Sequence, residues 1–289
     1  MSRSTPIPGL GARPPARATA PGVDPRVAGL VALLLALAAV SWNVTNARMR
    51  GMDMGPGTDP GSLGFYLTTW VVMLAAMMFP SVTPMVIAYA RIHRRRRELG
   101  RRAPLGCTAV FVAGYLIAWT IYGLAAYALY AWATSLSPDF LSWDRGGRYL
   151  AGAVILAAAV YQLTAAKDVC LTKCRTPMDF ILGRIRYGYG GALRMGVEHG
   201  AWCVGCCWAL MAALFALGVM SVGWMAVVGA FIAVEKMLPW KLLANRSVAI
   251  ALAVLALGVA LAPGSVPGLT LPDAVHSMPG MGGSTSMPR

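Results

Sequence analysis

The sequence predicts an all-α fold, a polytopic bundle of about seven transmembrane helices, with six as the alternative count. Hydrophobic residues make up 57% of the 289-residue chain and charged residues only 12%, and the mean hydropathy is +0.61. Apolar stretches recur along the chain, each bounded by charged residues, proline or glycine. This composition is typical of a membrane protein rather than of one or two soluble domains.

The first apolar stretch, residues 27–42, is short for a membrane span. At about 1.5 Å per residue it reaches roughly 24 Å, against about 30 Å of hydrocarbon, so it must recruit flanking residues. We expect a retained helix, with a cleaved signal peptide as the alternative, because Leu37, Ala38 and Ala39 could precede a cleavage site. The other expected spans are 65–89, 105–133, 149–166, 200–220, 223–234 and 247–262.

Both ends of the chain differ in composition from the apolar middle. Residues 1–26 are rich in Pro, Ala, Gly and Arg without an apolar period, and we expect a disordered cytoplasmic tail. The transmembrane helical domain is expected at 27–262. Residues 263–289 are expected to form a flexible extracytoplasmic tail that contains Met and His.

Basic residues are unevenly distributed between the two sides of the expected bundle. If the N-terminus is cytoplasmic, 20 of the 25 Lys and Arg fall on the cytoplasmic side, in the N-terminal tail and in 91–102, 167–194 and 236–246. The positive-inside rule thus accounts for the net charge of +14. Membrane lipid, and not nucleic acid, is the expected partner of the arginine run 94–97.

Several chemistries are disfavoured by what the sequence lacks. It has neither a G-x-x-x-x-G-K-[ST] phosphate loop nor a C-x-x-C-H haem motif, and its three histidines argue against paired bis-His haem sites and three-His zinc centres. The ionisable residues Lys167, Glu198, Glu235 and Lys236 fall at the ends of expected spans, which argues against a proton- or sodium-coupled carrier. We predict no catalytic residues and do not expect an enzyme.

Cysteine and histidine gather at the start of the span 200–220. His199, Cys203 and Cys207 are spaced i, i+4 and i+8, so they share one face of a helix, and Cys206 lies beside them. In the same segment Gly196 and Gly200 make a small-x-x-x-small step, extended by Gly205. This step allows another helix to approach closely.

A second cysteine pair, Cys170 and Cys174, is also spaced i, i+4, in a polar segment. Both cysteine groups are expected at the cytoplasmic ends of helices, where they could meet. Thiolate and imidazole ligands favour Cu(I) or zinc over calcium and magnesium, and Lys173 and Arg175 would help thiolates to form. Packing of the cysteines in a core and a redox-active dithiol are the alternatives.

Methionine is the other soft donor, with 17 residues in the chain. Met73 and Met77 are spaced i, i+4, with Met78 beside them, and Pro80 and Pro84 are expected to break or kink the same helix. The M-x-x-x-M step resembles the thioether filter of eukaryotic copper uptake channels, with core packing as the alternative.

Two segments on the expected extracytoplasmic side carry soft donors outside the spans. Such Met/His tracts are typical of Cu(I) capture in oxidising compartments, with a neutral tail as the alternative. The donors in these segments are Met49, Met52, Met54, His276, Met278 and Met281.

Many of these residues fall in ordered motifs. The motifs are Trp70-x-x-Met73-x-x-x-Met77-Met78-x-Pro80-x-x-x-Pro84, Lys167-x-x-Cys170-x-x-x-Cys174-Arg175-x-Pro177, Gly196-x-x-His199-Gly200-x-x-Cys203-x-Gly205-Cys206-Cys207-Trp208, Gly218-x-Met220-x-x-x-Trp224-Met225 and then Glu235-Lys236. Together they resemble, over about 65–239, the bacterial family of predicted metal-binding integral membrane proteins known as domain of unknown function 2182. The resemblance implies a bacterial inner-membrane location and metal ligands at Cys170, Cys174, His199, Cys203, Cys206, Cys207, Met73, Met77 and Met78.

We therefore expect an integral membrane protein that binds a soft transition metal for transport, delivery or storage. Cu(I) is the metal we expect first, with zinc as the alternative. Metal would enter through the outer Met/His segments, pass along the Met-lined helix and stop at the cysteines. A metal-delivery protein or a larger membrane complex would be its partner.

Two other functional classes stay open. One is a membrane thiol-disulfide protein that uses the pairs Cys170/Cys174 and Cys206/Cys207. The other is a non-catalytic assembly subunit of a membrane complex. The sequence does not decide the direction of metal movement or the oligomeric state.

Overall fold

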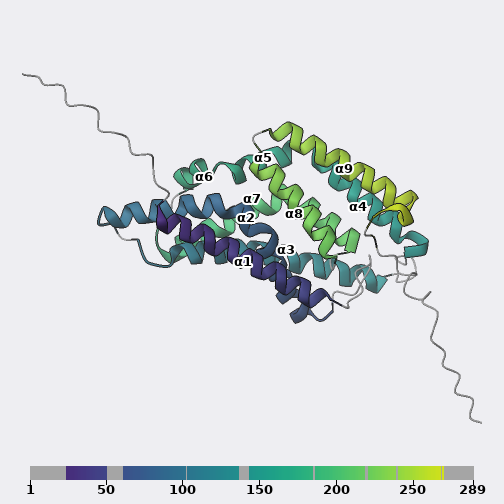
Figure 1. Ribbon diagram of the computed structural model, residues 1–289, viewed down its shortest axis with the longest axis horizontal. Helices are drawn as coiled ribbons and strands as arrows, with labels where there is room; N and C mark the ends of the chain where they lie inside the picture. Colours follow the sequence, from purple (N-terminus) through teal and green to yellow (C-terminus); the bar gives the residue numbers. More distant parts are fainter. Residues whose placement is uncertain are drawn as a thin grey trace, which may run out of the picture.

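The computed structural model describes residues 24–50, 61–101, 103–136, 143–184, 186–218, 221–238, 240–267 and 269. Within these ranges the chain forms helices and no strand, which confirms the predicted helical bundle (Figure 1). The helices are α1 (Pro25–Met49), α2 (Leu63–Glu98), α3 (Cys107–Leu136), η1 (Trp143–Gly147), α4 (Arg148–Tyr161), α5 (Ala165–Arg175), α6 (Pro177–Arg184), α7 (Gly188–Gly218), α8 (Val222–Met237), α9 (Lys241–Leu261) and η2 (Pro263–Ser265).

Five helices of the described chain are long and apolar enough to cross a membrane, and α4 with α5 makes up to six if that bent pair is one span. The five are α1, α2, α3, α7 and the Leu242–Leu261 part of α9. The sequence predicted about seven, with six as the alternative. The difference arises at 223–234, because α8 has only 16 residues, and at 149–166, because α4 ends before that stretch does.

Two helices depart from their expected limits. The first apolar stretch lies in a helix of 25 residues that starts at Pro25. Asp24 caps this helix, because its side chain accepts a hydrogen bond from the Arg26 amide. α2 was expected to break or kink at Pro80 and Pro84; it is not broken there and continues through both to Glu98. Neighbouring helices and hydroxyl groups stabilise such helices in membrane proteins. The rest of α2 around the prolines is largely buried.

Glycine allows α3 and α7 to pack closely. A Cβ atom on Gly196 would lie 2.1 Å from the Phe111 carbonyl oxygen, and one on Gly200 would lie 2.7 Å from the Ala118 Cβ. The small-x-x-x-small step therefore brings the two backbones together, as expected. Gly205 serves a different neighbour, because its missing Cβ leaves room for the Cys170 thiol of α5.

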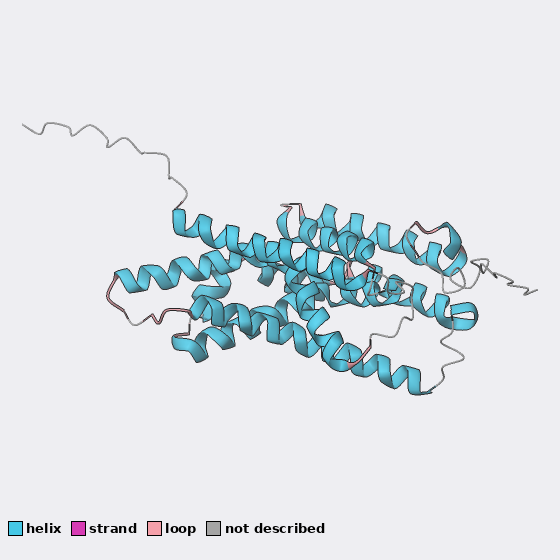
Figure 2. Cartoon of the chain, turned by 60° about the horizontal axis from the view of Figure 1, so that its bottom comes forward, coloured by secondary structure: helices cyan, strands magenta, loops and turns pink. Residues whose placement is uncertain are grey.

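The helices form an elongated bundle (Figure 2), and contacts join the residue before α1, the end of α2 and the residue before α7. Asp24, before α1, pairs with Arg94 near the end of α2. The Arg96 guanidinium lies 3.6 Å from the centre of the Tyr187 ring, just before α7. The Tyr189 hydroxyl donates to the Leu105 carbonyl over 2.9 Å. The starts of α1, α3 and α7 and the end of α2 thus share one end, as the charge pattern predicted.

α5 turns away from α4 by 67° and packs on α7. Thr164 caps the new helix by accepting a hydrogen bond from the Lys167 amide over 3.3 Å. Lys167 is thereby carried inside the bundle, where its ammonium lies 2.6 Å from the Glu235 carboxylate and the two side chains are 0% and 2% exposed. Both residues lie near the ends of their helices, as expected, and inside the bundle each supplies the other's counter-charge.

Candidate metal centre

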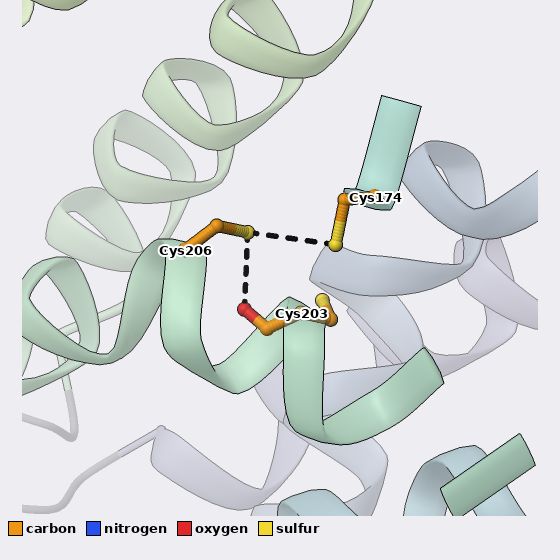
Figure 3. A group of neighbouring side chains, drawn as sticks. All are labelled: Cys174, Cys203 and Cys206. Atoms are coloured by element: carbon orange, nitrogen blue, oxygen red, sulfur yellow. Dashed lines mark hydrogen bonds between the residues drawn. The ribbon is translucent and has the colours of Figure 1, made fainter. Parts of the chain in front are cut away.

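Three cysteine sulfurs from two helices form a compact group (Figure 3). Cys174 comes from α5, while Cys203 and Cys206 come from α7, and their Sγ atoms all lie within 4.8 Å of one another. The Cys206 and Cys174 sulfurs are 3.7 Å apart. Cys203 and Cys206 are each 1% exposed, and Cys174 is half-buried. We call Cys174, Cys203 and Cys206 the three-sulfur group; it is the one such cluster of Cys, His or acidic ligands in the described chain.

The helical spacing of α7 positions two of these sulfurs. Cys203 and Cys206 are three residues apart, near the middle of the helix, so both face the same side. The Cys206 thiol donates to the Cys203 carbonyl over 3.1 Å and points toward α5 (Figure 3). Cys207, which sequence reasoning placed on the same stripe as Cys203, donates to that carbonyl over 2.9 Å. Its sulfur lies 3.9 Å from that of Cys206.

The position of Cys174 depends on contacts between α5 and the end of α8. The Arg175 guanidinium donates to the Glu235 carbonyl over 3.1 Å and also to the Leu238 carbonyl. One end of α5 is tied by this contact and the other by the buried Lys167–Glu235 pair. These two contacts with α8 hold Cys174, the residue next to Arg175, against α7.

Lys236 brings positive charge to the three-sulfur group. Its ammonium nitrogen lies 3.0 Å from the Cys203 sulfur and 3.5 Å from the Ser81 hydroxyl of α2. The Tyr115 hydroxyl of α3 lies 3.1 Å from the same sulfur. Cys203 is therefore well placed to carry a thiolate, which the ammonium stabilises. Sequence reasoning named Lys236 only as a charge at a span end; its place in the Glu235-Lys236 motif was the available signal.

His199 lies one helical turn before Cys203 but does not belong to the three-sulfur group. Its ring is packed among Phe111, Tyr115 and Phe180, with centroid separations of 6.0, 6.0 and 5.3 Å. The imidazole is buried and its Nδ1 has no hydrogen-bond partner. A ligand role for His199 stays a prediction, as it does for Cys170, whose thiol is packed on the backbone of Gly205.

The methionine stripe of α2 leads toward the same centre. Met73, Met77 and Met78 are all buried, and Met77 lies against Gly229 of α8. One turn after Met77 comes Ser81, which contacts the Lys236 ammonium. Met77 is thus one helical turn from a residue that contacts the same ammonium as Cys203 does.

Met49 is buried at the end of α1. The guanidinium of the preceding residue, Arg48, reaches the hydroxyls of Thr68 and Thr69 over 3.1 and 3.4 Å. Thr69 is one turn before Met73 on α2. The other outer donors predicted from the sequence lie outside the described residues: Met52, Met54, His276, Met278 and Met281.

The sulfur separations suit one soft metal ion. Metal–sulfur bonds of about 2.3 Å put three thiolates around one ion roughly 4 Å from one another. The observed 3.7 Å between Cys174 and Cys206, with all three sulfurs within 4.8 Å, fits that arrangement. Buried thiolates select soft or borderline ions such as Cu(I) and Zn(II).

Comparison with known proteins points to copper. A family model described as PpoB2, copper chaperone, matches residues 67–259, which include the three-sulfur group, Lys236 and the methionine stripe. No curated protein and no solved structure matches the chain. The match supports the metal-related part of the resemblance drawn from the sequence, but not the name domain of unknown function 2182.

Proposed function

Since the chain belongs to the PpoB2 copper chaperone family, we propose that it takes up Cu(I) within the membrane and holds it between Cys174, Cys203 and Cys206 for delivery to an acceptor protein. The observation that carries this proposal is the buried three-sulfur group, whose members lie within 4.8 Å of one another. Copper is the cargo here. The protein lies in the bacterial inner membrane with its N-terminus in the cytoplasm.

The chemistry of binding is an exchange of protons for metal. Each thiol that ligates Cu(I) releases its proton, and the oxidation state of copper does not change. Cys203 begins the exchange, because the Lys236 ammonium already faces its sulfur at 3.0 Å. Burial of the sulfurs keeps water and oxidants away from the bound ion.

The methionine stripe supplies a route to the thiolates. Met52, Met54 and the tail donors His276, Met278 and Met281 would capture Cu(I) outside the membrane, and Met49, which is buried at the end of α1, would receive it from them. Met73, Met77 and Met78 would then bind it weakly and pass it inward. Thioethers are neutral and thiolates are charged, so affinity for Cu(I) rises toward the cysteines and gives the transfer its direction.

Cys207, Cys170 and His199 serve as exchange ligands around the three-sulfur group. Cys207 is 3.9 Å from Cys206, so one ligand can replace another without the ion leaving sulfur. His199 lies one helical turn before Cys203 on α7, and its buried Nδ1 has no hydrogen-bond partner. An acceptor protein would take copper through such three-coordinate intermediates.

The direct test is copper binding by the purified full-length protein in detergent. Under anaerobic, reducing conditions we expect about one Cu(I) per chain, with only sulfur in the first coordination shell by X-ray absorption. Cys203→Ser and Cys206→Ser should each weaken Cu(I) binding at least about 100-fold in competition with bathocuproine disulfonate. Cys107→Ser, which removes a buried thiol of α3 outside the three-sulfur group, is the matched control. Equal copper content in wild type and both serine variants would contradict the proposal.

A second function, thiol-disulfide exchange, is favoured by one distance. The sulfurs of Cys174 and Cys206 lie 3.7 Å apart on different helices, so a modest movement would join them. Alkylation followed by mass spectrometry separates the two functions. A reversible Cys174–Cys206 disulfide in cells, with copper well below one per chain, would favour redox exchange; thiols protected by copper favour the chaperone.

A further inference from the structure

We propose that Lys236 makes the three-sulfur group selective for monovalent over divalent soft ions, an inference that rests on the proposed copper function. The residue would act through its charge and not as a ligand. It would thereby distinguish Cu(I) from Zn(II), which the same thiolates would otherwise bind.

The ammonium is close enough to act on a bound ion. Its nitrogen lies 3.0 Å from the Cys203 sulfur, and a metal–sulfur bond adds about 2.3 Å. An ion bound to Cys203 is therefore within about 5 Å of the positive charge. The Lys236 ammonium also donates to the Ser81 hydroxyl of α2 over 3.5 Å, which helps to hold it in place.

The carboxylate nearest to Lys236 in the chain pairs with another cation. Glu235 precedes Lys236 in the chain, but its carboxylate pairs with Lys167 at 2.6 Å. Arg175 adds a second cation on the α5 side, where it donates to the Glu235 and Leu238 carbonyls. The group thus combines sulfur ligands with a local excess of fixed positive charge.

The ammonium disfavours a bound ion more strongly when the ion carries more positive charge. For the same set of thiolates, a divalent ion brings one more unit of positive charge near Lys236 than Cu(I) does, so the ammonium repels it more. An additional unit charge about 5 Å from the ammonium, at an effective dielectric constant of about 20, changes relative affinity by roughly 10²-fold. Removing the ammonium favours the divalent ion by that factor, whatever number of thiolates binds.

A purely structural role for Lys236 predicts a different result. If the side chain only fixed the Cys203 thiol, its loss would weaken the binding of both ions to the same extent. The ratio of the two affinities therefore separates charge selection from positioning. Lys236→Arg keeps the charge and should keep the ratio.

The experiment measures Cu(I) and Zn(II) dissociation constants for the full-length protein in detergent. Competition with bathocuproine disulfonate under anaerobic conditions gives the Cu(I) value, and competition with a chromogenic zinc chelator gives the Zn(II) value. We expect Lys236→Met and Lys236→Gln to shift the ratio toward Zn(II) by about 10²-fold, and Lys236→Arg by less than about threefold. Arg95→Met, which removes an exposed cation of α2 far along the helix from Ser81, should leave the ratio unchanged.

Silver and cadmium provide the second measurement. Ag(I) and Cd(II) repeat the difference in charge with other coordination preferences, so their ratio should shift in the same direction. An unchanged ratio for either ion pair in a folded Lys236→Met or Lys236→Gln protein would overturn the charge-selection inference and leave the copper function standing. Wild-type copper binding that does not depend on Cys203 and Cys206 would overturn both.

Discussion

Breaking the buried Lys167–Glu235 pair should destabilise the protein more than removing the pair altogether. The ammonium and carboxylate are 2.6 Å apart and 0% and 2% exposed. At an effective dielectric constant of about 20, two unit charges at that distance attract by roughly 6 kcal/mol, and most of this offsets the loss of hydration. Lys167→Met or Glu235→Gln should therefore each lower the free energy of unfolding by about 3–5 kcal/mol. The double variant Lys167→Met/Glu235→Met should lie within about 1 kcal/mol of wild type.

The assay is reversible unfolding in mixed micelles, followed by circular dichroism. Arg194→Met is the control, because Arg194 pairs with Glu198 at 3.1 Å while its own side chain is 62% exposed. Such exposed pairs contribute less than about 1 kcal/mol. The reasoning is refuted if either single substitution at the buried pair costs as little as the control, or if the double variant shows the sum of the two single losses.

Three further predictions concern other parts of the structure. Gly196→Ala places a Cβ 2.1 Å from a backbone oxygen of α3 and should lower the free energy of unfolding by about 1–3 kcal/mol, measured by thermal unfolding. The control Gly190→Ala places a Cβ where nothing lies within 4 Å, and it should be neutral or slightly stabilising. The hydrogen bond with Arg94 holds the pKa of Asp24 below its usual value. The first turn of α1 should therefore be fully protected against hydrogen exchange at pH values above the ordinary pKa of aspartate, and this protection should be lost as the pH falls through the lowered pKa. Unchanged protection in Asp24→Asn would count against this. Cys207→Ser should retain Cu(I) affinity to within about threefold, because its thiol donates to a backbone carbonyl and is not part of the three-sulfur group; a loss as large as that of Cys206→Ser would contradict this assignment.

Hydropathy alone was sufficient to predict the long helices of the bundle, because each consists largely of one apolar stretch. Hydropathy did not predict that the polar helix α5 would place a charged side chain inside the bundle. The segment that starts at Lys167 is polar, and burial of its ammonium depends on Glu235, 68 residues later. A periodicity analysis within one segment cannot detect such a partner. The charge pattern placed Cys170 and Cys174 at the same end of the bundle as the start of the span 200–220, but the periodicity did not show that α5 packs on α7.

The cysteine cluster could be predicted in outline but not in its pairings. The i, i+4 rule put Cys203 with Cys207, because it records which residues share a helical face. The approach of α5 then decides which thiols actually meet, and it brings Cys174 to Cys206 at 3.7 Å. Lys236 was missed as part of the centre because its contact with Cys203 joins two helices 33 residues apart in sequence.

The origin of the three sulfurs divides the centre into a fixed and a movable part. Cys203 and Cys206 belong to one turn of a long helix, so their spacing persists whatever α5 does. Cys174 belongs to a helix of 11 residues that is joined to α4 through a bend of 67°. A rotation of α5 would convert a three-coordinate ion into a two-coordinate one with an open face, provided that the contacts of Lys167 and Arg175 with α8 open at the same time. Tight retention and rapid hand-over, which conflict in a rigid chelate, can then be governed by separate elements of the same chain.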